Sequence, residues 1–231
     1  MGHPVSLSTP LGRISGWRAD PPFEPRGAII LIQEIFGVTS HIRRQVDRFA
    51  AHGFICVAPA FFDHIDYRIE LPYNDEGVAR GRALVEELGF DKVLGDVRSV
   101  VAELAGEANV GVVGYCWGGT VAYLCNTRLG LPAVSYYGGR TMPFVRERLK
   151  APMEFHFGQY DPIISPEDVA ATKDAHPEAT FYVYEAGHGF NCDERGDYHP
   201  ESANIAMDNT VTFMTRVLRT FVASSAGMAL P

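Results

Sequence analysis

The sequence predicts an α/β protein, with a mostly parallel sheet that carries helices on both faces. Short apolar runs alternate along the chain with longer segments of helical periodicity. Several of these runs are continuously apolar, which is typical of strands buried on both faces of a parallel sheet. No linker, repeat or low-complexity tract divides the 231 residues. We therefore expect one domain over residues 1–231, with a frayed tail at 224–231.

The charge balance limits the classes of partner. The chain has 20 Lys and Arg against 28 Asp and Glu, a net charge of −8. This acidity argues against nonspecific binding to nucleic acid or anionic membranes, although it leaves room for a local basic pocket. No apolar stretch is long enough to span a bilayer, and the N-terminal residues lack the basic-then-apolar pattern of a signal peptide. We expect a cytoplasmic protein.

The four cysteines show no pattern of a disulfide framework or a zinc motif. Cys56, Cys116, Cys125 and Cys192 contain no C-x-x-C spacing, and no compact Cys/His cluster occurs. We expect free thiols, no bound metal and no cofactor.

The first half of the chain alternates strands and helices. An edge strand is expected at Leu11–Trp17, followed by a proline-rich turn and a buried strand at Ala28–Ile32. Thr39 or Ser40 can cap a helix that runs from His41 to about His52 and ends at Gly53. Further expected elements are a strand at Phe54–Val57, an irregular aromatic segment at Ala60–Asn74, and helices at Asp75–Leu88 and Asp91–Leu104.

The second half repeats the alternation. Ser165, Pro166 and the acids after them give a clear helix start, with a cap, a proline at the first position and acids in the first turn. Strands are expected at Val110–Val113, Ala133–Tyr137, Met153–Phe157 and Thr180–Tyr184, with helices from Trp117 to about Arg128 and from about Pro200 to Val222.

The most informative stretch is a sharp turn between the strand at Val110–Val113 and the next helix. Gly114 and Gly118 bracket Cys116 in a Gly-x-Cys-x-Gly pattern. With serine in place of cysteine, this is the nucleophile elbow of α/β-hydrolases. The elbow holds its nucleophile at a helix N-terminus, where the helix dipole and free N–H groups favour a thiolate and an oxyanion. The alternative is that Cys116 is a small buried hydrophobic residue, as most lone cysteines are.

Three candidate catalytic groups each follow an expected strand. Cys116, Asp161 and His188 occur in the order nucleophile, acid, base, and all would emerge at one edge of a parallel sheet. His188 would move the proton, and Asp161 would hold the imidazole tautomer. The backbone N–H groups of Trp117 and Ile35 would form an oxyanion hole. Taken alone, an Asp before a proline after a strand, such as Asp161, is usually an ordinary turn residue.

Glu34 directly follows the buried strand at Ala28–Ile32. If it faces the same site, its negative charge would disfavour the thiolate until a substrate displaces it. It could also be a surface carboxylate or a partner for Arg43 or Arg44 on the following helix.

Four segments of the chain carry a resemblance to a known family. They are Gln33–Val38 (QEIFGV), Gly114–Gly119 (GYCWGG), Tyr136–Gly138 (YYG), and Glu185–His188 (EAGH) with Phe190. A cysteine elbow together with the first of these segments is rare elsewhere. Through them, from about Leu11 to Met214, the chain resembles the dienelactone hydrolase (carboxymethylenebutenolidase) family.

The resemblance implies an α/β-hydrolase fold, no cofactor, and hydrolysis of an enol-lactone such as dienelactone to maleylacetate. It implies the triad Cys116, Asp161 and His188, and a Glu34 that holds the resting thiol and moves when substrate binds. A substrate-gripping arginine falls best on Arg80, with Arg82 as the fallback, and Tyr136 is expected in the pocket wall.

One segment departs from the family pattern. The best-known members carry a serine just after the histidine and an arginine a few residues on, where this chain has Gly189 and Cys192. One carboxylate-binding arm is therefore missing, unless Arg195 replaces it from a rearranged loop.

The expected function is hydrolysis of an enol-lactone or small activated ester, with or without a carboxylate, through a thiol-ester on Cys116. One alternative is a carboxylesterase or thioesterase acting on a neutral substrate. Another is a non-catalytic small-molecule binding or redox-sensing protein on the same scaffold. The sequence leaves the natural substrate and the oligomeric state open.

Overall fold

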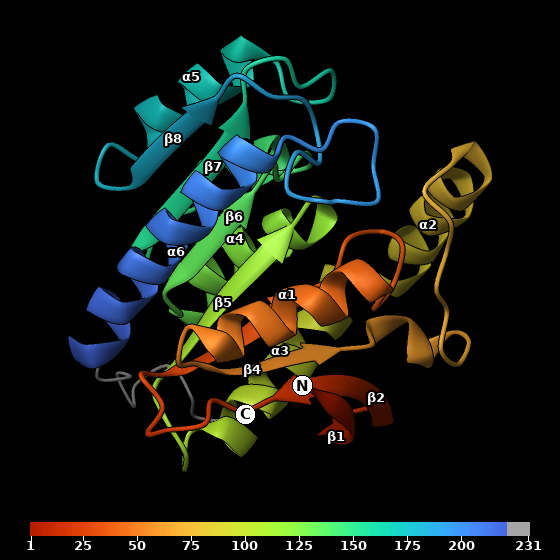
Figure 1. Ribbon diagram of the computed structural model, residues 1–231. Helices are drawn as coiled ribbons and strands as arrows, with labels where there is room; N and C mark the ends of the chain where they lie inside the picture. Colours follow the sequence, from red (N-terminus) through yellow and green to blue (C-terminus); the bar gives the residue numbers. More distant parts are fainter. Residues whose placement is uncertain (221–231) are drawn as a thin grey trace.

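The computed structural model describes residues 1–220, and the expected tail at 224–231 lies outside this range. Among these residues, no helix combines the length and apolar character needed to cross a membrane. The structure confirms the predicted α/β fold, in which one sheet of eight strands is covered by helices on both faces (Figure 1).

The sheet is parallel except at its N-terminal edge. Its strands follow the order β1-β2-β4-β3-β5-β6-β7-β8. β1 pairs with β2, and β2 with β4, in antiparallel fashion, whereas all later pairs are parallel. The strands are β1 (His3–Thr9), β2 (Gly12–Ala19), β3 (Ala28–Ile32), β4 (Ile55–Pro59), β5 (Val110–Tyr115), β6 (Ala133–Tyr136), β7 (Met153–Gly158) and β8 (Thr180–Tyr184).

The helices form two layers around this sheet. α1 (Ser40–Ala51) and α6 (Pro200–Thr220) lie together over one face, as Figure 1 shows, and α3 (Phe90–Leu104) and α4 (Trp117–Leu129) pack on the other. The remaining helices are α2 (Asp75–Leu88), α5 (Pro166–Ala175) and two short 3₁₀ turns, η1 (Phe61–His64) and η2 (Met142–Phe144).

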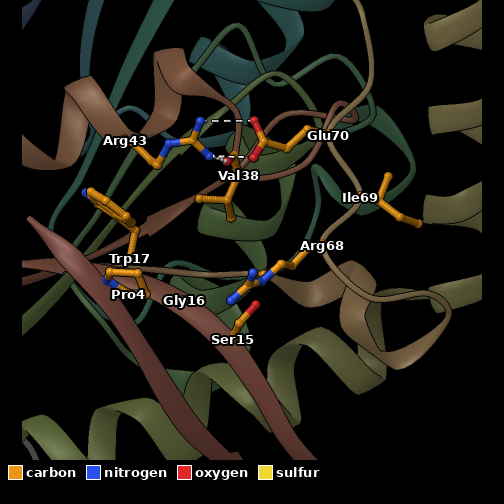
Figure 2. A pocket seen from close by; sticks show the side chains of 10 residues that line it. Pro4, Ser15, Gly16, Trp17, Val38, Arg43, Arg68, Ile69 and Glu70 are labelled. Carbon is orange, nitrogen blue, oxygen red and sulfur yellow. Dashed lines mark hydrogen bonds and ion pairs between the residues drawn. The ribbon is translucent and has the colours of Figure 1, made fainter.

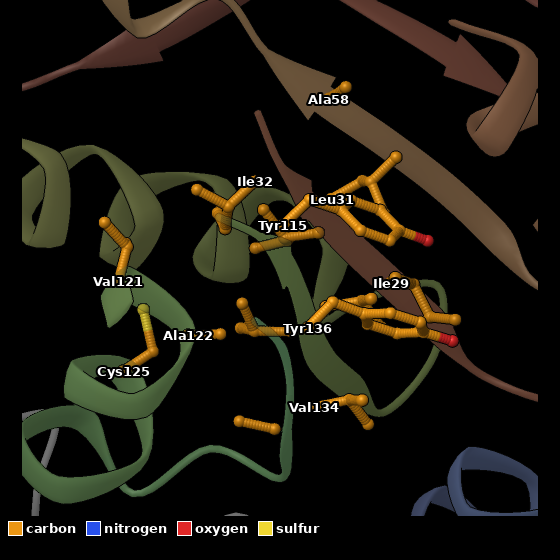
Figure 3. Close-up of a cluster of buried hydrophobic side chains, with 14 of the residues drawn as sticks. Ile29, Leu31, Ile32, Ala58, Tyr115, Val121, Ala122, Cys125, Val134 and Tyr136 are labelled. Atoms are coloured by element: carbon orange, nitrogen blue, oxygen red, sulfur yellow. The ribbon is translucent and has the colours of Figure 1, made fainter. Parts of the chain in front are cut away.

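The core is continuous through the central strands. Every residue of β3 and β5 is buried, as the apolar runs predict for strands covered on both faces. In Figure 3, Val121, Ala122 and Cys125 project from α4 on one side of this cluster, and Tyr115 and Tyr136 lie among the strand residues. This burial fixes the carboxyl ends of β3 and β5, from which the candidate site is built.

Most element boundaries agree with the predictions to within two residues. Thr39 caps α1, and α5 begins with a capping box between Ser165 and Asp168. The main difference is at the edge, where the strand expected at Leu11–Trp17 is β2, an inner strand, and the edge position belongs to the unpredicted β1.

Candidate active site

The turn between β5 and α4 places Cys116 in an uncommon backbone conformation. Its φ is 55° and its ψ −118°, a region that non-glycine residues rarely adopt. A Cβ on Gly114 would lie 1.8 Å from the carbonyl oxygen of Gly118, and one on Gly118 would lie 2.5 Å from that of Gln33. Both glycines are therefore required by close backbone approach, as the elbow pattern predicts.

The structure brings the three predicted catalytic side chains into one chain of contacts. His188 Nε2 lies 3.2 Å from Cys116 Sγ, and His188 Nδ1 lies 2.7 Å from Asp161 Oδ2. The other oxygen of Asp161 accepts hydrogen bonds from the N–H groups of Ile163 (2.7 Å) and Ile164 (3.2 Å). The carboxylate is thus held by its own turn and orients the imidazole.

The charges around His188 favour its protonated form. Burial alone would lower the pKa of the imidazole, but attraction to the sulfur of Cys116 and the hydrogen bond to Asp161 raise that pKa to about 10. A protonated imidazole at this distance can give its proton to a group that is bound beside Cys116.

Two backbone segments meet beside the sulfur. Ile35 and Trp117 line the same cavity as Cys116 and His188. Trp117 is the first residue of α4, where helical N–H groups have no intrahelical partner. The segment that carries Ile35 is held by a hydrogen bond from Leu71 N to Phe36 O (2.9 Å). This placement fits the predicted oxyanion hole.

Glu34 is buried and paired with Arg195. Arg195 Nη1 donates to Glu34 Oε1 at 3.3 Å, and the two side chains are 18% and 1% exposed. Burial alone would lower the pKa of Arg195, but the charges of Glu34 and Cys116 raise it. Glu34 is therefore neither a surface carboxylate nor a partner of Arg43 or Arg44. Arg43 pairs with Glu70, and Arg44 pairs with Asp193 and Glu194.

The cavity at the nucleophile has a volume of about 100 Å³. It is therefore suited to a small molecule. Three arginines line it together with apolar side chains, although the whole chain is acidic. Besides Ile35, Cys116, Trp117 and His188, the residues that line the cavity are Phe36, Val78, Arg82, Gly139, Arg140, Ile163 and Arg195.

Two predicted substrate contacts are placed differently by the structure. Both Arg80 and Arg82 are exposed, but only Arg82 lines the cavity. Tyr136 is fully buried and does not line the cavity, since its hydroxyl donates to Ala206 O and contacts Thr210 on α6. The neighbouring Tyr137 lies next to the site instead, with its ring centroid 5.1 Å from that of His188.

The departure at Gly189 and Cys192 has a structural counterpart in Arg195. Gly189 has a φ of +78°, and a Cβ there would lie 2.7 Å from the guanidinium carbon of Arg195. Glycine at this position therefore leaves space for Arg195, which reaches the cavity from three residues beyond Cys192. Arg140 is a further lining arginine that the sequence analysis did not identify, although it directly follows the Gly138–Gly139 pair after β6.

A larger hollow of about 260 Å³ lies elsewhere, between β2 and the segment after η1. Figure 2 shows Arg43 paired with Glu70 on one side of it, and Arg68 extending toward Ser15 on the other. No cysteine or histidine lines this hollow. The smaller cavity at Cys116 is therefore the candidate active site.

Comparison of the sequence with known proteins finds relatives in one enzyme family. The sequence model of the Dienelactone hydrolase family matches residues 14–218. The carboxymethylenebutenolidase of Pseudomonas sp. (strain P51) is 31% identical over 226 residues, which cover 92% of this chain and 94% of that protein. A Synechocystis protein described as a "Putative carboxymethylenebutenolidase" is 32% identical over 216 residues, covering 83% and 87% of the two chains.

Solved structures also resemble this fold. The crystal structure of a "Putative Dienelactone Hydrolase" from Klebsiella pneumoniae superposes with a TM-score of 0.84 at 25% identity, covering 94% of this chain and 98% of that one. The similarity extends over nearly the full length of both chains.

Proposed function

The chain belongs to the dienelactone hydrolase family and is a carboxylic ester hydrolase, and on that premise we propose that it opens small anionic enol-lactones or activated esters through a thiol-ester on Cys116. The observation that carries the proposal is the contact chain from Cys116 through His188 to Asp161, with distances of 3.2 and 2.7 Å.

Acylation begins when His188 takes the thiol proton of Cys116, which leaves a thiolate beside the imidazolium. The sulfur of Cys116 forms a bond to the carbonyl carbon, and the electron pair of the C=O bond moves onto its oxygen. The N–H groups of Ile35 and Trp117 stabilise this oxyanion. When the C=O bond re-forms, the C–O bond to the leaving oxygen breaks, and the imidazolium of His188 gives that oxygen its proton.

Deacylation reverses the proton path. Water attacks the thiol-ester while neutral His188 takes its proton, and the C–S bond then breaks with the electron pair returning to sulfur. The products are the carboxylic acid and a restored thiolate–imidazolium pair. Throughout, Asp161 stabilises the imidazolium, because its orientation is fixed by the N–H groups of Ile163 and Ile164.

The lining of the cavity supports an anionic substrate. Arg82, Arg140 and Arg195 place three guanidinium groups around a small space whose other walls are mainly apolar. A carboxylate on the substrate would find charge-assisted donors there. Arg195 already pairs with Glu34, but a neutral carboxylester or thioester would make no use of the charges of Arg82 and Arg140, so we favour the anionic class.

Replacement of the nucleophile tests the mechanism. Cys116→Ala should lower kcat/KM for dienelactone and for a nitrophenyl ester by roughly 10³-fold or more, because the covalent step is lost. Cys125→Ala, which alters a buried thiol on α4, should keep turnover near the wild-type rate. Wild-type rates in Cys116→Ala would rule out the nucleophile.

Paired arginine variants test the substrate class. Arg82→Ala should lower kcat/KM for a carboxylate-bearing lactone by about 10–100-fold, the effect of losing a hydrogen bond to a charged group, and leave a neutral nitrophenyl ester unaffected. Arg80→Ala, on the same helix and outside the cavity, is the matched control and should change neither. Equal losses on charged and neutral substrates in Arg82→Ala would contradict an anionic pocket.

A further inference from the structure

Two buried side chains, one in the segment after β3 and one on α1, each leave a polar atom without a hydrogen-bond partner. The two atoms are Glu34 Oε2 and His41 Nε2. Burying an unpartnered polar atom costs about 1–3 kcal/mol. Such atoms are normally satisfied by an ordered water or a bound ion, so this part of the interior points to an occupant.

Three metal-ligating side chains converge at this place. Glu34, His41 and Cys192 each present one ligand atom, and these atoms all lie within 4.8 Å of one another. All three residues are fully buried. They come from the segment after β3, from the first turn of α1 and from the loop after His188. The separation of the three positions in sequence explains why residue spacing predicts no metal motif.

The orientation of His41 is set from its far side. His41 Nδ1 contacts Asp193 Oδ1 at 3.1 Å, which leaves Nε2 as the unpartnered ring nitrogen. Histidines that bind metals commonly donate their other ring N–H to a carboxylate, which fixes the tautomer and the ring orientation. Asp193 is the carboxylate that fixes the ring of His41 in this way, and it is next in sequence to Cys192.

The loop that supplies Cys192 is docked on α1 by contacts that need no ion. Arg44 Nη2 donates to Asp193 at 2.7 Å and to Glu194 at 2.6 Å, and Ser40 also contacts Glu194. These contacts hold His41 and Cys192 near each other before any ligand arrives. The pre-organised geometry lowers the entropy cost of binding.

We propose that Glu34, His41 and Cys192 form a binding site for a single zinc-class transition metal ion, separate from the catalytic triad. A carboxylate, an imidazole and a thiolate are the three side chains that zinc binds most, and three protein ligands leave a fourth position for water. The mixed sulfur and nitrogen set disfavours magnesium and calcium, which prefer oxygen ligands.

Charge balance is consistent with a divalent ion. Binding exchanges the thiol proton of Cys192, which leaves to solvent, for a bond from sulfur to the metal. The ion then bonds to one thiolate and one carboxylate, both of which attract a divalent cation, while the carboxylate keeps its ion pair with Arg195. Arg195 bonds Glu34 through Oε1, and the unpartnered Oε2 remains for the metal.

Cobalt titration of the full-length, chelator-treated protein tests the proposal. We expect one equivalent of Co²⁺ to produce a thiolate-to-cobalt charge-transfer band that Zn²⁺ abolishes by displacement. Cys192→Ser should lose the band, whereas Cys116→Ser and Cys125→Ser, which remove other thiols, should keep it. Zn²⁺ should raise the melting temperature of the wild type, and circular dichroism confirms that each variant is folded.

The carboxylate behind His41 provides a second variant that touches no metal. Asp193→Asn should weaken Co²⁺ binding by about 10–100-fold, the usual effect of losing such a partner. It also keeps the test decisive if Cys192→Ser fails to fold. An undiminished affinity in Asp193→Asn would overturn the proposed ligand geometry.

Two further outcomes would overturn the site. Loss of the band in Cys116→Ser with retention in Cys192→Ser would place the metal at the triad. Absence of saturable binding and of any melting shift would mean that waters alone fill this space. Because none of these measurements uses ester turnover, they are independent of the proposed hydrolase mechanism.

Discussion

At the scale of single residues, the charge that surrounds Cys116 depends on the Glu34–Arg195 pair. A lone carboxylate near the sulfur would disfavour the thiolate, and a lone guanidinium would favour it. The two are joined at 3.3 Å, and Arg195 is close enough to Cys116 for the sulfur to influence its pKa. Their effects on the nucleophile therefore offset each other.

Removing either partner should shift thiol reactivity in opposite directions. In mildly acidic, chelator-treated solution, Glu34→Gln should speed alkylation of Cys116 by iodoacetamide a few-fold, because it leaves the positive Arg195 unbalanced, and Arg195→Ala should slow it. The alkylated residue is identified by mass spectrometry. Arg43→Ala breaks a similar pair with Glu70 at the other hollow and should leave the rate unchanged. Shifts of the same sign in both active-site variants would contradict the offset.

The sequence predicts the triad because each member lies in the loop or turn after a strand, and parallel strands end at one edge. It does not distinguish Arg80 from Arg82. Residues two apart on a helix point in nearly opposite directions, and which of these directions faces the cavity depends on how the helix packs in the folded protein. Tyr136 and Tyr137 present a similar difficulty, because β6 ends at Tyr136 and Tyr137 turns away with a φ of 40°, which the apolar pattern does not reveal. Arg195 lies in an irregular loop whose path no periodicity describes.

At the scale of elements, the elbow between β5 and α4 leaves no room for side chains at its glycines. Gly114→Ala should destabilise the fold by about 1–3 kcal/mol or more, since its Cβ would overlap the backbone of Gly118. Gly95→Ala on α3 is the matched control. Its Cβ would meet only Pro10, at 3.7 Å, so the helix should gain about 0.5–1 kcal/mol. Urea unfolding measures both, and equal effects would contradict the steric argument.

The helices and buried strands were predictable because caps and apolar runs are local signals. Thr39, Asn74 and Ser165 each accept a hydrogen bond from a backbone N–H at the start of a helix, as a cap does. β1 was missed because it is largely exposed and polar, so only its pairing with β2 identifies it as a strand.

At the scale of the whole molecule, buried histidines oppose one another in their response to pH. Burial lowers the pKa of His156, which lies in a polar network with Glu154 and Tyr184. Burial also lowers the pKa of His176. His188 is the opposite case, with a pKa raised to about 10 by Cys116 and Asp161 despite its burial. The usual imidazole pKa of 6.5 therefore lies above the pKa values of His156 and His176 and below that of His188.

Thermal stability should therefore have a maximum near neutral pH. The stabilisation of the fold by protonated His188 is complete below about pH 6.5 and is lost as the pH rises through about 10. The fold favours neutral His156, so the stabilisation by this residue is lost as the pH falls below 6.5. Melting curves against pH measure this. His188→Gln should flatten the alkaline side and His156→Gln the acid side, and unchanged slopes in both would contradict the assignment.

The turn that holds Asp161 determines which imidazole nitrogen carries the proton. Its Oδ1 is committed to two peptide groups, so only Oδ2 faces the ring. An isosteric amide would satisfy the same peptide groups and present its NH₂ where an acceptor is required, which would reverse the tautomer without moving an atom. The ring nitrogen that is left to exchange protons beside the sulfur is therefore selected by the main chain of a short loop, tens of residues away from both Cys116 and His188.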